Sequence, residues 1–294
     1  MTVSSAERKV RAGLPLIRLL QVYMPLSVAR WAEKRSAEHV NMPADIAHEV
    51  VSADGVRCEW IIPQNNSKDR VLLYLHGGGF VFGLSALHRQ MVAYLARKMG
   101  VRAMMVDYRL APEHPFPAAL DDCVAAYRWL LKQGFAAQHI VIAGDSAGGN
   151  LTITTLMKLR DSGDPLPTAA ACLSPVADMT DREAVFKQVY DPILHPKAAR
   201  TYNQAYVARN DNHNPLISPI LGDWHGLPPL LVHAGGDEIL RDDAVRIEEV
   251  AKAAGVDVRL EIYPRMWHVW QIYASLPQAG ESLDDIAQFL KTHL

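Results

Sequence analysis

The chain has 294 residues, 49% of them hydrophobic and 21% charged, so it is long and apolar enough to bury one large core. The formal net charge is -2, from 30 basic and 32 acidic residues without long blocks of one sign, so the overall charge directs it toward neither nucleic acid nor an anionic membrane. A small neutral substrate fits this balance better. Cys58, Cys123 and Cys172 have no C-x-x-C spacing, which is typical of neither a zinc site nor a disulfide framework and favours a reducing, cytoplasmic setting.

The amino-terminal segment predicts helix from about residue 4 to residue 38. Its apolar stretch, residues 14–28, loosely imitates a signal peptide, but Pro15, Arg18 and Pro25 interrupt it and no small-x-small cleavage site follows. The stretch is also too short and too polar to span a bilayer. We therefore expect an amphipathic helix of the mature protein and no stable membrane insertion.

One side of this helix forms an apolar stripe. Leu16, Leu19, Leu20, Tyr23 and Met24 recur near helical spacing, so they lie along one face. We expect that face to contact a partner surface; ordinary packing in the core is the simpler alternative.

The period of the hydrophobic pattern changes at Ile46. Two β-branched segments, residues 46–51 and 56–62, flank Asp54-Gly55, a dipeptide typical of tight hairpins, and predict an antiparallel edge of a sheet. Six further buried strands are expected at residues 71–75, 101–106, 140–143, 169–173, 230–234 and 258–263. Helical segments lie between most of them, at residues 87–99, 118–132, 150–160, 242–254 and 282–290. This alternation predicts an α/β fold with a mainly parallel sheet covered by helices on both faces.

One segment breaks the alternation. Residues 178–214 contain no strand pattern, only a helix-like piece at residues 196–208 and clusters of turn residues. So long an excursion between two strands is either a lid over a ligand site or a passive surface insertion. We favour the lid, completed by the amino-terminal helices, because ligand sites of parallel sheets lie at the carboxyl ends of the strands.

The stretch Gly144-Asp145-Ser146-Ala147-Gly148 joins an expected strand directly to a helix. A serine on so sharp a turn has a strained backbone, and glycines two positions before and after it remove the Cβ atoms that would collide. The turn exposes the hydroxyl of Ser146 and leaves the N–H of Ala147 at a helix N-terminus. Ser146 is therefore the candidate nucleophile, although an ordinary glycine-rich turn has the same pattern.

A serine hydroxyl needs a base to take its proton and a third group to orient that base. His268 follows the last expected strand, and Asp237 follows the strand before it. The chain order is therefore serine, acid, histidine, as an α/β-hydrolase requires. Three neighbouring acids remain alternatives to Asp237, but Glu238, Asp242 and Asp243 are better placed to cap or charge the following helix.

A second glycine motif, His76-Gly77-Gly78-Gly79-Phe80, directly follows the strand at residues 71–75. Three consecutive glycines are costly in conformational entropy, which is understandable where backbone N–H groups approach a ligand closely. The motif is typical of the oxyanion loop of lipases and esterases, with the N–H groups of Gly78 and Gly79 acting together with that of Ala147. Phosphate binding is a weaker interpretation, because neither a G-x-x-x-x-G-K nor a complete dinucleotide motif is present.

Further motifs accompany these two. They are Asp107-Tyr108-Arg109-Leu110-Ala111-Pro112-Glu113, Phe116-Pro117-Ala118-Ala119, Leu227-Pro228-Pro229 and Gly236-Asp237-Glu238-Ile239-Leu240. From about residue 45 to the end, the chain resembles the bacterial hormone-sensitive-lipase family of α/β-hydrolase carboxylesterases, in the branch whose serine motif is GDSAG.

The resemblance implies an α/β-hydrolase fold with a mainly parallel eight-stranded sheet, residues 46–177 and 215–294, and a helical cap made from residues 1–45 and 178–214. It also implies a triad of Ser146, Asp237 and His268, an oxyanion hole of Gly78, Gly79 and Ala147, and hydrolysis of short to medium acyl esters without cofactor or metal. Phe80, Phe82, Trp267 and Trp270 are candidates for the substrate pocket, with packing in the core as an equal alternative.

The chain departs from the family pattern at Val269 and Trp270, where a small residue and phenylalanine are usual, and at Val176, where tryptophan is frequent. These positions affect the expected pocket shape more than the expected catalysis. Two alternatives remain: a non-catalytic binding protein of this fold, such as the plant gibberellin receptors, which lack the histidine, and a peptidase or amidase with the same triad. A homodimer is left open.

Overall fold

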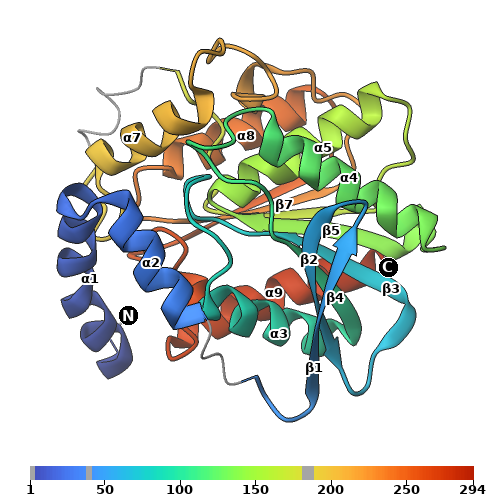
Figure 1. The fold of residues 1–294 in the computed structure, drawn as a ribbon, viewed down its shortest axis with the longest axis horizontal. Coiled ribbons are helices and arrows are strands. Elements are labelled where there is room, and N and C mark those ends of the chain that lie inside the picture. The colour runs from blue at the N-terminus through green and yellow to red at the C-terminus, as the bar shows by residue number, and fades with distance from the viewer. Residues whose placement is uncertain (1–3, 38–41, 181–188) are drawn as a thin grey trace.

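The structure, a computed structural model, describes residues 4–37, 42–180 and 189–294. Its centre is an eight-stranded sheet in the order β1-β2-β4-β3-β5-β6-β7-β8 (Figure 1). The strands are β1 (Ile46–Ala53), β2 (Val56–Pro63), β3 (Ser67–Leu75), β4 (Val101–Val106), β5 (Ile140–Asp145), β6 (Ala170–Leu173), β7 (Leu230–Gly235) and β8 (Val258–Tyr263). β2 pairs antiparallel with β1 and β4, and the other pairings are parallel, so the predicted mainly parallel sheet is confirmed.

The hairpin predicted at Asp54-Gly55 is confirmed. Ala53 pairs with Val56 across the turn, and both turn residues have positive φ, 51° at Asp54 and 93° at Gly55. Those angles match the twist of the two flanking strands. The hairpin fixes the antiparallel edge, from which the parallel part of the sheet continues.

Helices cover both faces of the sheet (Figure 1). On one face lie α3 (Ala86–Met99) and α9 (Pro277–Thr292), and on the other lie α4 (Ala118–Lys132), α5 (Ala147–Asp161) and α8 (Arg241–Ala253). The side chains of β3 point alternately to the two faces. Val71, Leu73 and Leu75 pack on the face of α4, α5 and α8, whereas Leu72 and Tyr74 pack on the face of α3 and α9. This alternation is the period of two that a strand imposes. Short 3-10 turns occur at Ala137–His139, Pro219–Leu221 and Trp270–Ile272.

The amino-terminal segment forms two helices rather than one. α1 (Ser5–Tyr23) begins at Ser4, whose hydroxyl accepts the N–H of Glu7 at 3.0 Å, and α2 (Leu26–Ala37) follows Pro25. The ring of Pro25 removes a backbone donor and favours a break there. Residue 38, the expected helix end, lies outside the described residues.

The apolar stripe expected on this segment is not packed into the core. Leu16, Leu19 and Tyr23 are exposed, while Leu14 on the other side of α1 is buried against Met266 and other residues. Core packing, the simpler expectation for the stripe, is therefore wrong.

The expected helix in the insertion is confirmed as α7 (Pro196–Val207), beside α1 (Figure 1). His195 caps it by accepting the N–H of Lys197 at 3.0 Å. Its aromatic residues reach the loop after β3, because Tyr206 stacks on Phe80 at 3.7 Å between ring centroids and Tyr202 meets Phe82 edge to face. Residues 181–188 of the insertion lie outside the described residues.

Candidate active site

Ser146 lies on the sharp turn between β5 and α5, with φ 53° and ψ −115°. The neighbouring glycines are required by contact: a Cβ on Gly144 would lie 2.3 Å from the carbonyl oxygen of Gly148, and one on Gly148 would lie 1.9 Å from that of Leu75. A side chain at either position would force the elbow off the sheet. The strained serine is held where the carboxyl ends of the central strands meet.

The structure brings His268 to this serine. Nε2 of His268 and Oγ of Ser146 are 2.8 Å apart, although the two residues are 122 positions apart in the chain. His268 follows β8, as the sequence predicts, and its side chain is almost wholly buried. The distance is that of a hydrogen bond through which a base takes the proton of a nucleophile.

The acid beside the histidine is Glu238, not Asp237. Oε2 of Glu238 lies 3.7 Å from Nδ1 of His268, an ion-pair separation, and the Glu238 side chain has no exposed surface. Asp237 instead pairs with Arg11 of α1 at 2.8 Å, and its side chain is 39% exposed. The expectation that Asp237 lies beside the histidine is therefore wrong.

The loop geometry gives the reason. The backbone N–H of Asp237 donates to the carbonyl of Met266 at 2.8 Å, which ties the two loops together and turns the Asp237 side chain toward α1. The next residue then points inward, toward the histidine. Spacing along the chain does not distinguish these two adjacent carboxylates. The difference lies in the direction in which the loop backbone turns each side chain.

Ser174, at the end of β6, joins Glu238 to the histidine loop. Its hydroxyl donates to Oε2 of Glu238 at 2.7 Å and accepts the N–H of Val269 at 3.1 Å. One buried hydroxyl thus positions the carboxylate and the residue next to His268. The sequence pattern gives no signal for this contact.

A second buried carboxylate, Asp191, lies near the same histidine. Its side chain accepts the N–H groups of Ile193 and Leu194, both at 2.9 Å, and that of Ile239 at 3.2 Å. Ile239 directly follows Glu238, so Asp191 ties the insertion to the loop that carries the acid. Burial raises the pKa of Asp191 to about 6.

The carboxylates around His268 decide its protonation. Burial by itself would lower the pKa of His268, because a charged imidazolium loses solvent there. Glu238 opposes this most strongly, followed by Asp191 and Asp145, and together they raise the pKa of His268 above its ordinary value. The raised pKa means that these carboxylates stabilise the imidazolium that forms when His268 accepts a proton.

The triple-glycine loop follows β3 as expected. Gly78 has φ 111° and Gly79 has φ 59°, conformations that suit glycine. The loop turns back tightly, since the N–H groups of Val81 and Phe82 both donate to the carbonyl of Gly78. Within the described residues, no hydrogen-bond acceptor is recorded for the N–H groups of Gly78, Gly79 or Ala147.

Asp145, whose role the sequence left unexplained, anchors this loop to the elbow. Its buried carboxylate accepts the N–H of Gly77 at 3.0 Å and the hydroxyl of Tyr74 at 2.8 Å, and it lies 3.3 Å from Nε2 of His88. Burial favours the neutral acid, but the electrostatic interaction with His88 and these hydrogen bonds hold the pKa of Asp145 below its ordinary value. The carboxylate next to Ser146 therefore stays ionised and fixes the start of the glycine loop.

His88 is itself oriented by the start of α3. The N–H of Ser85 donates to Nδ1 of His88 at 3.3 Å, and the hydroxyl of Ser85 accepts the N–H of His88 at 3.2 Å, which forms a capping box. With Nδ1 accepting, Nε2 carries the proton that faces Asp145. The helix cap, the carboxylate and the glycine loop thus form one connected network.

The amino-terminal helices hold the same loop from outside. Arg30 of α2 donates to the carbonyls of Val81 and Ala111, both at 2.5 Å, and Glu33 accepts the N–H of Gly83 at 3.1 Å. Burial raises the pKa of Glu33. α2 therefore restrains the segment that follows the three glycines.

Of the four aromatic pocket candidates, only Phe82 lines a described cavity. Phe82 is half-buried and lines an apolar cavity of about 290 Å³ between α1, α2 and α7. Phe80, Trp267 and Trp270 have no exposed surface. The two tryptophans pack in a cluster with Leu14, so they support α1 rather than line either described cavity.

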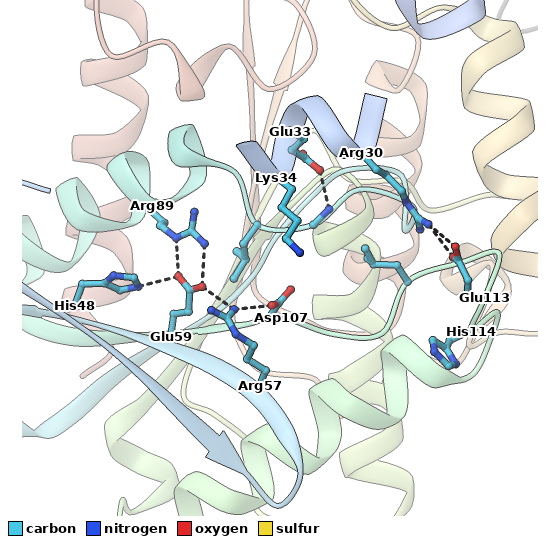
Figure 2. Close-up of a pocket in the computed structure, with 13 residues that line it drawn as sticks. Arg30, Glu33, Lys34, His48, Arg57, Glu59, Arg89, Asp107, Glu113 and His114 are labelled. Carbon is cyan, nitrogen blue, oxygen red and sulfur yellow. Dashed lines mark hydrogen bonds and ion pairs between the residues drawn. The ribbon is translucent and has the colours of Figure 1, made fainter. Parts of the chain in front are cut away.

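A larger cavity, of about 890 Å³, lies between α2, β2 and the start of α3. Figure 2 shows ion pairs among several of its charged residues: Arg89 and Arg57 contact Glu59, Arg57 also contacts Asp107, and Arg30 contacts Glu113. Ser146 and His268 do not line it. The residues described by the structure contain no group of three side chains suited to hold a metal ion.

A family model described as alpha/beta hydrolase fold matches residues 72–272. An acetyl-hydrolase of Streptomyces hygroscopicus is 40% identical over 247 residues, covering 83% of this chain and 82% of that protein. An esterase of Acinetobacter venetianus is 36% identical, covering 80% of this chain and 78% of that protein.

Solved structures agree over the whole length. A crystal structure of an esterase from the bacterial hormone-sensitive lipase family has 40% identity and a TM-score of 0.91, covering 100% of this chain and 99% of that one. The chain belongs to this family. A second member, a hormone-sensitive lipase from a metagenome library, has 34% identity and a TM-score of 0.89. The expected family, fold and carboxylesterase class are thereby confirmed.

Among the described residues, no helix of this family member is long and apolar enough to cross a membrane.

Proposed function

We propose that Ser146 is the nucleophile of this carboxylesterase, that His268 is its general base, and that Glu238 orients and charge-balances the imidazole. The hydrogen bond of 2.8 Å between Ser146 and His268 carries the proposal. Ser146 attacks the ester carbonyl while its proton passes to Nε2 of His268. The imidazolium then returns that proton to the departing alcohol, and water repeats the cycle on the acyl-enzyme.

The oxyanion of each tetrahedral intermediate is assigned to the N–H groups of Gly78, Gly79 and Ala147. Two of them belong to the loop that Asp145 anchors, and the third begins α5. One donor of this kind contributes on the order of 3 kcal/mol to the transition state. The donors are fixed before substrate arrives, so no reorganisation is needed during the reaction.

The substrates are esters with short to medium acyl chains, hydrolysed without cofactor or metal. The apolar cavity of about 290 Å³ that Phe82 lines supports this size range. α1, α2 and α7 form most of its wall, so we assign residues 1–45 and 178–214 to a cap over residues 46–177 and 215–294. A cytoplasmic location is supported by three buried free cysteines.

The test is Ser146→Ala, assayed with the 4-nitrophenyl esters from acetate to laurate. We expect loss of turnover by a factor of about 10³ or more. Ser162→Ala, at the exposed end of the same helix, is the matched control and keeps full activity. Retained turnover in Ser146→Ala contradicts the proposal. Tight ligand binding by the wild type without turnover favours a binding protein, and cleavage of amides rather than esters favours an amidase.

A further inference from the structure

The cap helices expose an unusual number of large apolar side chains. Among the described residues of α1 and α2, seven large apolar residues are exposed: Leu16, Ile17, Leu19, Leu20, Tyr23, Val28 and Trp31. Tyr23 is 75% exposed, Trp31 64% and Leu16 62%. We call these seven residues the α1–α2 face. Large apolar side chains left exposed on two helices that line a common cavity indicate an interaction surface.

Helical spacing makes the face continuous along α1. Leu16, Leu19 and Tyr23 follow one another at intervals of three and four residues, which places them on one side of the helix. Leu14 lies on the opposite side and is buried against Met266. α1 is therefore already docked on the protein by its other side, so the face remains available for a partner.

The exposed charges on α1 and α2 themselves have one sign. Every charged residue that is exposed among the described residues of α1 and α2 is basic: Arg8, Lys9, Lys34 and Arg35. The acidic residues of the two helices turn inward, since Glu7 is 2% exposed and contacts Arg265, and Glu33 accepts the N–H of Gly83. The whole chain has a net charge of -2, but the exposed charged residues of these two helices are basic.

We propose that the α1–α2 face docks the protein onto an anionic lipid surface. The aliphatic side chains enter the boundary between acyl chains and headgroups, the aromatic rings of Tyr23 and Trp31 sit at headgroup level, and Lys9 and Lys34 meet the lipid phosphates. An apolar stripe between basic residues is typical of a helix that lies in the plane of a membrane.

A second copy of the chain fits this face less well. An isologous dimer brings the same patch of both copies together. Lys9 and Lys34 of one copy would then approach the basic residues of the other, and like charges in an interface are unfavourable. An anionic lipid surface satisfies the apolar residues and the charges together.

The face is joined to the apolar cavity of the cap. Ile17 and Leu20 belong to the face and also line that cavity, whose wall includes Val81 and Phe82 after the glycine loop. A docked protein therefore has an apolar path from the lipid surface toward the loop that follows Gly79. The docking itself is independent of the proposed catalysis, so vesicle binding tests it without any measurement of turnover.

Trp31 is a built-in reporter for the experiment. It is the one exposed tryptophan of the six, since Trp129 is half-buried and the others are buried. The full chain is mixed with vesicles of phosphatidylcholine and phosphatidylglycerol in which part of the lipid is brominated in its acyl chains. We expect quenching of tryptophan fluorescence with these vesicles, little with pure brominated phosphatidylcholine, and a loss of quenching in Trp31→Phe.

Two sets of variants measure affinity by vesicle sedimentation. Leu16→Ser combined with Leu19→Ser is expected to weaken binding about tenfold or more, because each leucine loses its burial in lipid. Lys9→Glu combined with Lys34→Glu is expected to weaken it by a similar factor, since each basic residue near the surface contributes about 1 kcal/mol. Ile262→Ser, an exposed apolar residue on β8, is the matched control and binds as the wild type does.

Three outcomes overturn the proposal. The first is wild-type protein that stays in the supernatant with anionic vesicles in about 0.1 M salt. The second is unchanged vesicle affinity in the double leucine variant while circular dichroism shows native fold. The third is a stable dimer, seen by light scattering, that the double leucine variant dissociates and that does not bind vesicles, since a second copy then covers the face.

Discussion

At the scale of single residues, the two carboxylates after β7 have separate tasks. Glu238 is buried beside His268 and receives the hydroxyl of Ser174, whereas Asp237 is partly exposed and pairs with Arg11. The buried acid acts on the protonation of the imidazole. The exposed acid tethers α1, where an ion pair open to solvent contributes about 1 kcal/mol at most.

This division predicts opposite outcomes for two conservative variants. Glu238→Gln removes the charge that most strongly raises the pKa of His268, so we expect the acid limb of kcat/KM to move to lower pH. The maximal rate should also fall by about 10²- to 10⁴-fold, because the imidazolium loses its counter-charge. Asp237→Asn should keep both the rate, within about threefold, and the pH profile. A larger loss in Asp237→Asn than in Glu238→Gln contradicts the assignment.

The sequence alone predicted that Ser146 and His268 lie together, as they do in the structure, because each position rests on a local pattern. Ser146 stands in a strand-turn-helix motif whose glycines meet backbone atoms, and His268 follows the last strand. Ser174 and Asp191 were not predicted, since their contacts with Val269 and Ile239 span 95 and 48 positions and depend on how the loops fold back. Sequence patterns therefore predict residues whose position depends on local structure, but not contacts between loops that are far apart in the chain.

At the scale of elements, the carboxylate of Asp145 connects the end of β5 to the glycine loop and to α3. It joins Gly77, Tyr74 and His88, so the turn at Ser146 and the glycine loop share one buried anchor. The glycine at position 77 belongs to this anchor, because a Cβ there would lie 2.2 Å from Oδ2 of Asp145.

Replacing Asp145 with Asn keeps the size of the side chain and removes its charge. The amide nitrogen is a donor where the carboxylate accepted from His88, so two donors face each other in the core. We expect a loss of stability of about 1.5–3 kcal/mol, the usual contribution of a hydrogen bond to a charged group, together with a lower kcat as the glycine loop loosens. Thermal unfolding and steady-state kinetics measure both. Asp161→Asn, exposed at the end of α5, is the control, and equal effects in the two variants refute the anchor role.

The strands and central helices were predictable because alternation and β-branched runs determine them locally. The orientation of α1 was not. Its apolar residues occur on two sides, and only the tertiary structure shows that Leu14 packs inward while Leu16 and Leu19 stay exposed. A helix with apolar residues on both sides offers two possible contact faces, which its sequence pattern does not rank.

At the scale of the whole molecule, the proposed catalytic residues are held by segments far apart in the chain. α1 contacts the acid and histidine loops through Arg11 and Leu14, and it contacts the insertion through Arg18, which donates to the carbonyl of Asp191 at 2.9 Å. α2 restrains the glycine loop through Arg30. α1 and α2 therefore support the loops around Ser146 and His268, and they also line the apolar cavity beside Phe82.

Asp191 is where these segments meet, and it provides a test of their joint effect. Its charge helps to raise the pKa of His268, with Glu238 and Asp145 as the other acids acting on that ring. Because the base must be neutral, kcat/KM of the wild type should fall as the pH drops through a value above the usual histidine pKa of about 6.5. In Asp191→Asn that fall should move to lower pH, while Asp211→Asn, exposed in the same insertion, should leave it in place. A profile that is identical in all three proteins, or one that moves to higher pH in Asp191→Asn, shows that the carboxylate of Asp191 does not act on His268.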